Sequence, residues 1–276
     1  MNLRNVRISR TVIFLLLSVI GASTVYPLLF MALNTFRTTS AFELNPYGLP
    51  HSLSLSNFSQ LLSAYPFAAS LLHSTIVVVP AVALGTLSSA LAAFVFAKTP
   101  FRFSNALFYL MLAVMLMPGV VLIIPLYVMV VHFGLANNFG PAILIYAAIN
   151  IPFGTYLLRA NFRSIPDGLI EAARVDGAGW LRIFWKIVLP TSKAAVATVG
   201  ILTFLNAWNE LFISIVLLHT PGTEMVTPTV TEISGRYTTD IPVLFAGLLL
   251  AALPTVLVYA VTARVFVRGM LSGSLR

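Results

Sequence analysis

The sequence contains no cysteine and very little charge. Of its 276 residues, only 9% are Asp, Glu, Lys or Arg, whereas 59% are hydrophobic. Without cysteine the chain can form no disulfide, thiolate nucleophile or cysteine-ligated metal site. A soluble domain carries roughly 25% charged residues, because its surface must stay hydrated. The scarcity of charge therefore excludes a soluble globular protein.

The few charges are also unevenly distributed. Four long tracts contain no charged residue: Thr11 to Phe36, Leu44 to Ala97, Phe103 to Leu158 and Ile241 to Ala263. A helix of about 20 apolar residues crosses the hydrocarbon core of a bilayer, so each tract is long enough for one span or two. We therefore expect an all-α integral membrane protein.

Turn residues and charges divide these tracts into six expected transmembrane helices. Pro, Ser and Asn residues make 43–66 a polar loop, and the Gly and Asn residues of 132–141 end another helix. The chain is expected to form a single transmembrane domain, residues 1–276. Its six spans are expected at about 11–34, 67–97, 103–131, 141–158, 194–218 and 242–263.

The basic residues predict the orientation. With both termini in the cytoplasm, all of the 16 Lys and Arg residues except Arg37 and Arg236 fall in cytoplasmic segments. Short loops rich in Lys and Arg stay cytoplasmic, so this orientation is the expected one. The net charge of +8 is then a topology signal, with anionic membrane lipid as a secondary partner and no nucleic acid partner.

The longest cytoplasmic connection, residues 159–193, is expected to contain two helices. Ser164 is predicted to cap a helix over 168–176, with Gly177 ending it in the left-handed conformation. A second, amphipathic helix is indicated by apolar residues at helical spacing, while Arg182 and Lys186 face elsewhere and Pro190 ends it. Its apolar positions are Trp180, Ile183, Phe184, Ile187 and Val188.

The first of these two helices could serve as a docking element. Small residues would let another protein approach its backbone closely, and charged residues would orient that protein. The small residues are Ala172, Ala173, Gly177, Ala178 and Gly179, and the charged ones are Glu171, Arg174 and Asp176. A solvated, charged helix between two spans accounts for the same periodicity equally well.

The same residues resemble a family motif. Glu171-Ala172-Ala173, then three residues, Gly177, nine residues, and Ile187-Val188-Leu189-Pro190 match the EAA loop of bacterial ABC importer permeases in every residue and spacing. The resemblance covers nearly the whole chain and is strongest to the carbohydrate type, of the maltose and glycerol-phosphate kind. Further matching segments are 92–98, 117–118, 124–127, 133–138, 207–212 and 266–274. The tail departs from the family: this sequence ends in Ser-Leu-Arg, whereas the usual ending resembles Ala-Val-Lys.

This resemblance implies a type I ABC importer permease fold in the bacterial inner membrane. It implies that Glu171 to Gly179 is a coupling helix seated in a cleft of a cytoplasmic ATPase dimer, which holds the ATP and Mg²⁺. It also implies a second permease subunit and an extracytoplasmic solute-binding protein. The family resemblance favours a different chain, rather than a second copy of this one, as the second permease subunit. That protein would meet the loop after the first span and residues 220–241.

Several polar residues lie within the expected spans. Glu210 is the single carboxylate there, and at roughly 24 Å along the fifth span it should face the bundle interior or a watery cavity. It could form a gate or substrate contact with Asn206 and Asn209, or serve as a structural hydrogen-bonding site. Asn150, before Pro152, could line a pathway. Trp208, with Met115 and Met117, could form an apolar wall for a sugar ring or belong to the core.

The sequence carries no motif of an enzyme or nucleotide-binding protein. It has no G-x4-G-K-[ST] loop or nucleophile elbow, and its four histidines lack metal-ligand spacing. We therefore expect no catalytic residue, metal or cofactor in this chain. An ion-gradient-driven secondary transporter is the alternative function, although only Glu210 could couple an ion within the spans. An intramembrane hydrolase ranks below it, since no dyad is apparent.

Overall fold

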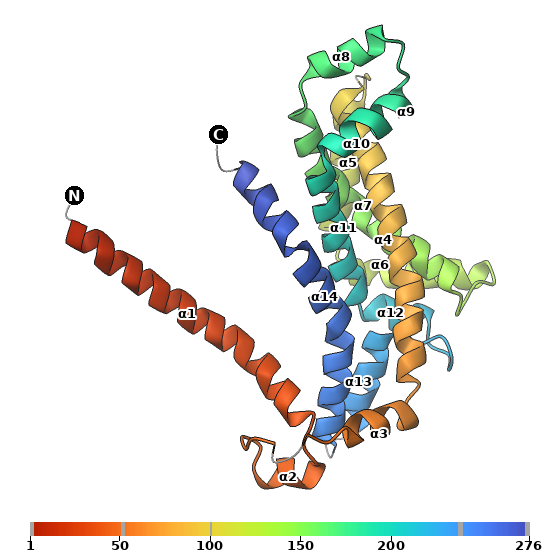
Figure 1. Cartoon of the computed structure of the whole chain (residues 1–276). Helices are drawn as coiled ribbons and strands as arrows, with labels where there is room; N and C mark the ends of the chain where they lie inside the picture. The colour runs from red at the N-terminus through yellow and green to blue at the C-terminus, as the bar shows by residue number, and fades with distance from the viewer. Residues whose placement is uncertain (1–2, 51–52, 100, 237–239, 274–276) are drawn as a thin grey trace. The chain divides into compact units, whose positions relative to one another are not determined.

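The structure of the chain, a computed structural model, describes residues 3–50, 53–99, 101–236 and 240–273. Throughout these ranges every regular element is a helix, which confirms the all-α fold expected from the sequence (Figure 1). Side chains at 3–10, 236 and 263–273 are not described. The terminal arginines and the tail motif at 266–274 therefore lie outside the described side chains.

Four helices are individually long and apolar enough to cross a membrane. They are α1 (Leu3–Asn34), α4 (Phe67–Lys98), α7 (Phe139–Arg163) and α14 (Ile241–Gly273). Two bent helix pairs also qualify, which makes six spans if each pair counts as one.

The third expected span, 103–131, is not one straight helix. α5 (Ser104–Ala113) and the short 3-10 helix η1 (Val114–Leu116) are bent by 97° from α6 (Gly119–His132). Met117 between them is extended, with φ −81° and ψ 125°. Proline disfavours the helical conformation in the residue before it, so Pro118 breaks this segment.

The fifth expected span, 194–218, is also interrupted. Three residues, 209–211, separate α11 (Lys193–Trp208) from α12 (Phe212–Leu217). The amphipathic helix that precedes α11 consists of α9 (Trp180–Ile183), the π-helical η2 (Phe184–Val188) and α10 (Leu189–Thr191). It is bent by 83° from α11. The predicted end at Pro190 is therefore one residue early, and the helix reaches Thr191.

The segments expected as loops contain short helices. α2 (Thr39–Leu44) and α3 (Ser56–Ala64) follow α1, and α13 (Val226–Arg236) lies within 220–241. Thr38 begins α2, because its hydroxyl accepts a hydrogen bond from the Ala41 amide at 3.3 Å.

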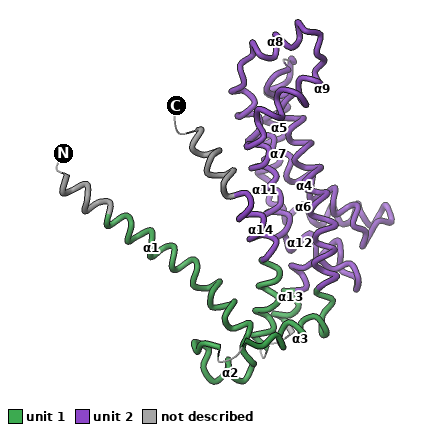
Figure 2. Tube along the Cα trace, in the orientation of Figure 1, with its two compact units in different colours: residues 1–67, 230–252 green, residues 68–229, 253–276 purple. Residues whose placement is uncertain are grey.

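The chain divides into two compact units (Figure 2). Unit 1 comprises residues 1–67 and 230–252, and unit 2 comprises 68–229 and 253–276. In unit 1 the buried Arg37 guanidinium organises the segment after α1, since it donates to the Asn34 side chain and to three backbone carbonyls. These carbonyls belong to Ala41, Asn45 and Pro46.

In unit 2, three long helices approach one another closely. A Cβ atom added at Gly154 of α7 would lie 2.5 Å from the Ser89 hydroxyl of α4 and 2.9 Å from a Val199 methyl of α11. Gly85 of α4 likewise faces the backbone of Ala147 on α7, whose oxygen would be 3.1 Å from an added Cβ. Glycine at these positions lets the helix backbones approach without a clash.

Near the end of α7, a buried arginine joins three helices. Arg159 is only 6% exposed. Its guanidinium lies 3.8 Å from the ring centroid of Phe108 and donates to the Asn105 side chain at 2.8 Å and to the Phe96 carbonyl at 3.3 Å. These contacts tie the end of α4 and the start of α5 to α7.

Candidate functional site

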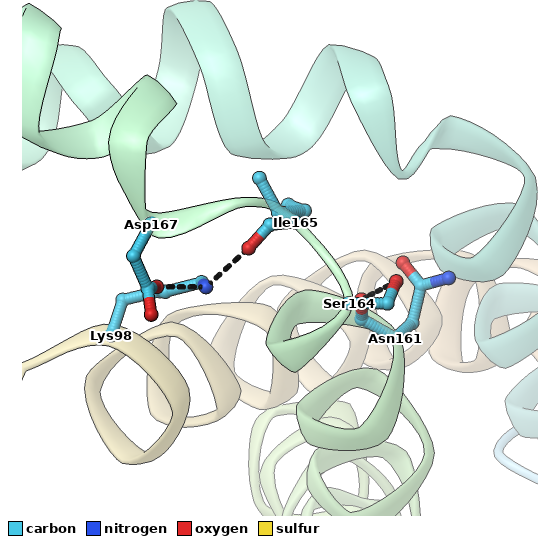
Figure 3. Close-up of polar contacts among 5 residues, drawn as sticks. All are labelled: Lys98, Asn161, Ser164, Ile165 and Asp167. Carbon is cyan, nitrogen blue, oxygen red and sulfur yellow. Dashed lines mark hydrogen bonds and ion pairs between the residues drawn. The ribbon is translucent and has the colours of Figure 1, made fainter.

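The loop between α7 and α11 begins with α8 (Asp167–Val175). The prediction that Ser164 caps this helix is wrong: its hydroxyl donates to the Asn161 carbonyl at 2.7 Å, at the end of α7 (Figure 3). Pro166 occupies the N-cap position with ψ 132°, and no side chain caps the helix. The extended proline separates Ser164 from the first amides of α8.

The end of α8 has the conformation predicted for it. Gly177 has a φ of +80°, which glycine adopts readily. The Gly177 amide donates to the Arg174 carbonyl at 3.0 Å, and the Ala178 amide donates to the Ala173 carbonyl at 2.9 Å. This pair of bonds is a Schellman motif, so the turn after α8 is fixed by its own backbone.

One face of α8 is anchored and the other is exposed. Ile170 is 5% exposed and belongs to a buried apolar cluster, against which Ala173 and Ala178 pack. The other predicted docking residues are exposed: Glu171, Ala172, Arg174, Asp176 and Gly177. Two exposed apolar residues that the sequence analysis did not select, Leu169 and Val175, add to this face, and Val175 is 88% exposed.

The buried cluster around Ile170 contains the apolar face of the amphipathic helix. Ile183, Phe184 and Val188 are fully buried, whereas Arg182 and Lys186 are exposed, as the periodicity predicts. Trp180 packs beside the cluster, and the Arg174 guanidinium lies 4.6 Å from its ring centroid.

Lys98, the last residue of α4, makes the ionic contact to the start of α8 (Figure 3). Its ammonium donates to the Asp167 carboxylate and to the Ile165 carbonyl, each at 2.6 Å. The Lys98 side chain is 4% exposed and that of Asp167 is 79% exposed. Sequence reasoning missed this role; the only signal was that Lys98 directly follows the uncharged tract 44–97, a position that Arg37, Arg159 and Arg264 share after the other tracts.

A second candidate site is a cavity of about 430 Å³ between the broken helices of unit 2. It is lined by residues of α6, α7, α11 and α12, by the first two residues of η1, and by Met117 and Glu210 in the two helix breaks. Its polar lining comes from Tyr146, Asn150, Asn206 and Glu210, and Met115 and Met117 also line it. Three of the five residues expected along a pathway therefore meet here.

The other two, Trp208 and Asn209, lie elsewhere. Trp208 is 3% exposed and stacks on Phe204, with 5.4 Å between ring centroids. Asn209 directly follows α11 and is exposed, and its side-chain amide donates to the Leu205 carbonyl of α11 at 2.8 Å. Neither side chain is among those that line the cavity.

Glu210 lies in the break between α11 and α12. Its carboxylate accepts hydrogen bonds from the Phe212 and Ile213 amides at 2.9 Å and from the Ser214 amide at 3.3 Å. The Tyr146 hydroxyl of α7 donates to the same carboxylate at 3.0 Å. Glu210 therefore begins α12 and ties it to α7, as the structural interpretation predicts, while also lining the cavity.

The hydrogen bonds continue along the cavity wall. The Asn206 amide donates to the Asn150 side-chain oxygen at 3.3 Å, and the Asn150 amide donates to the Tyr146 carbonyl at 2.8 Å. Tyr146 was missed by the sequence analysis. Its signal is its position four residues before Asn150, which places both on one face of a helix.

Comparison with known proteins supports one family. Residues 81–272 match the family described as "Binding-protein-dependent transport system inner membrane component". This chain belongs to that family. The match runs from within α4 to the end of α14, so it includes α8, the Lys98 contact and the cavity lining of this permease.

The relatives of this permease include named importers. It is 31% identical over 254 residues to the diacetylchitobiose uptake system permease protein of Streptomyces coelicolor, across 91% of this chain and 84% of that protein. It is 28% identical to the melibiose/raffinose/stachyose import permease protein of Bacillus subtilis, across 97% of each. A chain of a bacterial ABC transporter that imports the acidic polysaccharide alginate has the same fold, with a TM-score of 0.78, 24% identity and coverage of 96% and 98%.

Proposed function

We propose that this permease is one of two membrane subunits of an ABC importer that moves a carbohydrate into the cytoplasm. Its family is binding-protein-dependent, and its named relatives take up oligosaccharides. We further propose that both termini are cytoplasmic and that an external solute-binding protein delivers the substrate. The second membrane subunit is expected to be a different chain.

The ATPase partner is proposed to bind α8. The observation that carries this proposal is the complete EAA loop on a helix whose exposed face is presented by a fixed turn. Leu169, Ala172 and Val175 offer an apolar contact on that face, and Glu171 and Asp176 supply charges beside it. Contiguous exposed apolar surface rimmed by charged residues is typical of a contact with another protein. ATP and Mg²⁺ would be bound by the ATPase dimer.

The substrate pathway is proposed to pass the cavity of about 430 Å³. A volume of this size is typical of small-molecule sites, and amide, phenol and carboxylate groups can hydrogen-bond sugar hydroxyls. Asn150, Asn206 and Glu210 supply such groups, with Tyr146 beside them. The second membrane subunit would close the open side of the pathway, and lipid would cover the apolar outer surface.

The transport function can be tested in proteoliposomes that contain this permease with its partner permease and ATPase. We expect uptake of at least one of radiolabelled maltose, melibiose, diacetylchitobiose or glucose when ATP and the binding protein are both present. Uptake by vesicles that contain this chain alone, driven by a proton or sodium gradient without ATP, would instead establish the secondary transporter.

The coupling role of α8 can be tested at Gly177. A valine at its φ of +80° strains the turn by roughly 1–2 kcal/mol, because the left-handed conformation crowds a Cβ atom. We expect Gly177→Val to abolish ATP-driven uptake while the complex still inserts in the membrane. Gly21→Val is the matched control, because Gly21 lies on α1, outside this loop, and has no atom within 4 Å of an added Cβ. Unchanged uptake by Gly177→Val would contradict the coupling role.

A further inference from the structure

We propose that Lys98 is a positioning residue that links α8 to α4, so that a displacement of α8 by the ATPase moves the second span directly. This inference rests on the proposed coupling function of α8. The chain connects α8 covalently to α7 and α9, whereas α4 lies 69 residues earlier and depends on a noncovalent contact.

The Lys98 contact is well suited to transmit force. The ammonium is held by two short hydrogen bonds, one to Asp167 at the first turn of α8 and one to the carbonyl of Ile165 just before it. Both bonds involve a charged group, which makes them stronger than neutral hydrogen bonds. Because the Lys98 side chain is 4% exposed, water competes little at its end of the pair.

The polar contact between α4 and the start of α8 is made by Lys98 alone among the described residues. A polar cavity of about 570 Å³ is lined by Lys98 and Thr99 at the end of α4, by Asn105 of α5, and by Glu171 and Arg174 of α8. In the part of the chain that the structure describes, α4 forms two hydrogen bonds to residues 165–176, and Lys98 donates both. Beside this hollow, the remaining support of α8 is the apolar cluster that contains Ile170 and Phe94.

The second span can carry a displacement farther than the broken spans. α4 is one helix of 32 residues, and it runs without a break from Phe67 to Lys98 (Figure 1). Unlike the third and fifth spans, it has no interruption at which a displacement could be absorbed.

α4 also packs against the wall of the 430 Å³ cavity. Gly85 approaches the backbone of Ala147, and the Ser89 hydroxyl donates to the Ile151 carbonyl at 3.3 Å. Ala147 and Ile151 directly follow Tyr146 and Asn150, which line the cavity. A displacement of α4 would therefore reach the polar wall of the proposed pathway.

The test measures sugar transported per ATP hydrolysed, in the proteoliposomes described above. The probe is whichever of maltose, melibiose, diacetylchitobiose and glucose the wild-type complex takes up fastest. Lys98→Met keeps an unbranched stem and removes the ammonium. Lys98→Arg restores a charged donor, and Lys186→Met is the matched control, since Lys186 is an exposed lysine of the loop that contains α8.

We expect Lys98→Met to lower the transport-to-ATP ratio by about tenfold while ATP hydrolysis persists, because α8 would then move without displacing α4. Lys98→Arg should recover most of the ratio, and Lys186→Met should match the wild type. An unchanged ratio for Lys98→Met, or a parallel fall in uptake and hydrolysis, would overturn the inference.

Failure of assembly is handled by a second variant. If the Lys98→Met complex does not assemble, Asp167→Asn removes the exposed partner of the ion pair and leaves the buried lysine in place. A reduced ratio supports the inference and a wild-type ratio refutes it. A wild-type complex with no ATP-dependent uptake of any sugar overturns the proposed function itself, which is a separate outcome.

Discussion

Replacement of Glu210 by glutamine tests the role of the polar contact between α7 and α12. The carboxylate accepts four hydrogen bonds. One oxygen accepts the Phe212 amide, and the other accepts the Ile213 amide, the Ser214 amide and the Tyr146 hydroxyl. In Glu210→Gln one oxygen becomes an NH₂ group, which cannot accept a hydrogen bond from an amide. At least one donor therefore loses its partner.

The expected loss of stability follows from these contacts. Removal of a helix-capping acceptor costs about 0.5–2 kcal/mol. The remaining hydrogen bonds are then accepted by a neutral amide oxygen instead of a carboxylate. They become weaker, because charge-assisted hydrogen bonds are roughly twice as strong as neutral ones. We expect Glu210→Gln to lower the free energy of unfolding by about 2 kcal/mol, a sum of these two effects. Tyr146→Phe removes one bond and should cost about 1 kcal/mol.

The assay is the thermal unfolding midpoint of the purified complex in nanodiscs, with ATP-driven uptake measured on the same variants. A loss of about 2 kcal/mol corresponds to a shift of about 4–8 °C for a domain of this approximate size. Asn209→Ala is the control, because Asn209 is exposed and bonds only to α11 in the described contacts. In a Glu210→Gln background, Tyr146→Phe should cost less than it does alone.

Two results would refute this reasoning. Glu210→Gln could unfold at the same temperature as Asn209→Ala, or the Tyr146 and Glu210 substitutions could be strictly additive. Either result would mean that the carboxylate does not hold α12 against α7. If the stability changes as expected and uptake is preserved, the contact is structural and Glu210 is not required for passage of the sugar.

Packing and the buried arginine yield two further predictions. Gly154→Ala should lower the unfolding midpoint, because overpacking costs about 1–3 kcal/mol. Gly200→Ala should be neutral or stabilising, because its added Cβ would meet only an ordinary contact at 3.6 Å. Equal midpoints for the two variants would contradict the close approach of the helices at Gly154. Arg159→Lys should destabilise the complex by about 1–3 kcal/mol although the charge is retained, since lysine cannot reproduce the contacts of the planar guanidinium with Phe108 and Asn105. Arg163 is exposed, so Arg163→Lys should match the wild type in the same thermal assay.

Local sequence rules predicted much of the loop that contains α8. The φ of Gly177 and the buried face of the amphipathic helix follow from short-range constraints, namely glycine's conformational freedom and the helical period. The capping prediction failed at Ser164, because Pro166 extends the chain before α8 begins and the hydroxyl bonds back to α7. Which of two adjacent helix ends a serine serves depends on how the chain turns between them.

The breaks within the spans were harder to predict. Apolar length is a signal for a membrane segment, but it is the same for a straight helix and for two helices bent by 97°. Pro118 marked one break. At Glu210 the break depends on a carboxylate that accepts the freed amides of α12, and no local rule distinguishes that role from an ordinary polar residue within a span.

The sequence by itself determined that this chain is a helical membrane protein and that it resembles permeases with an EAA loop. Scarce charge and exact motif spacing are properties of the linear chain. Only the tertiary structure decided which polar residues meet. Lys98 and Asp167 are far apart in sequence, as are Tyr146 and Glu210, and each pair forms because packed helices bring the two side chains within hydrogen-bonding distance. Hydrogen bonds act over about 3 Å, so their partners depend on the packing of the helices.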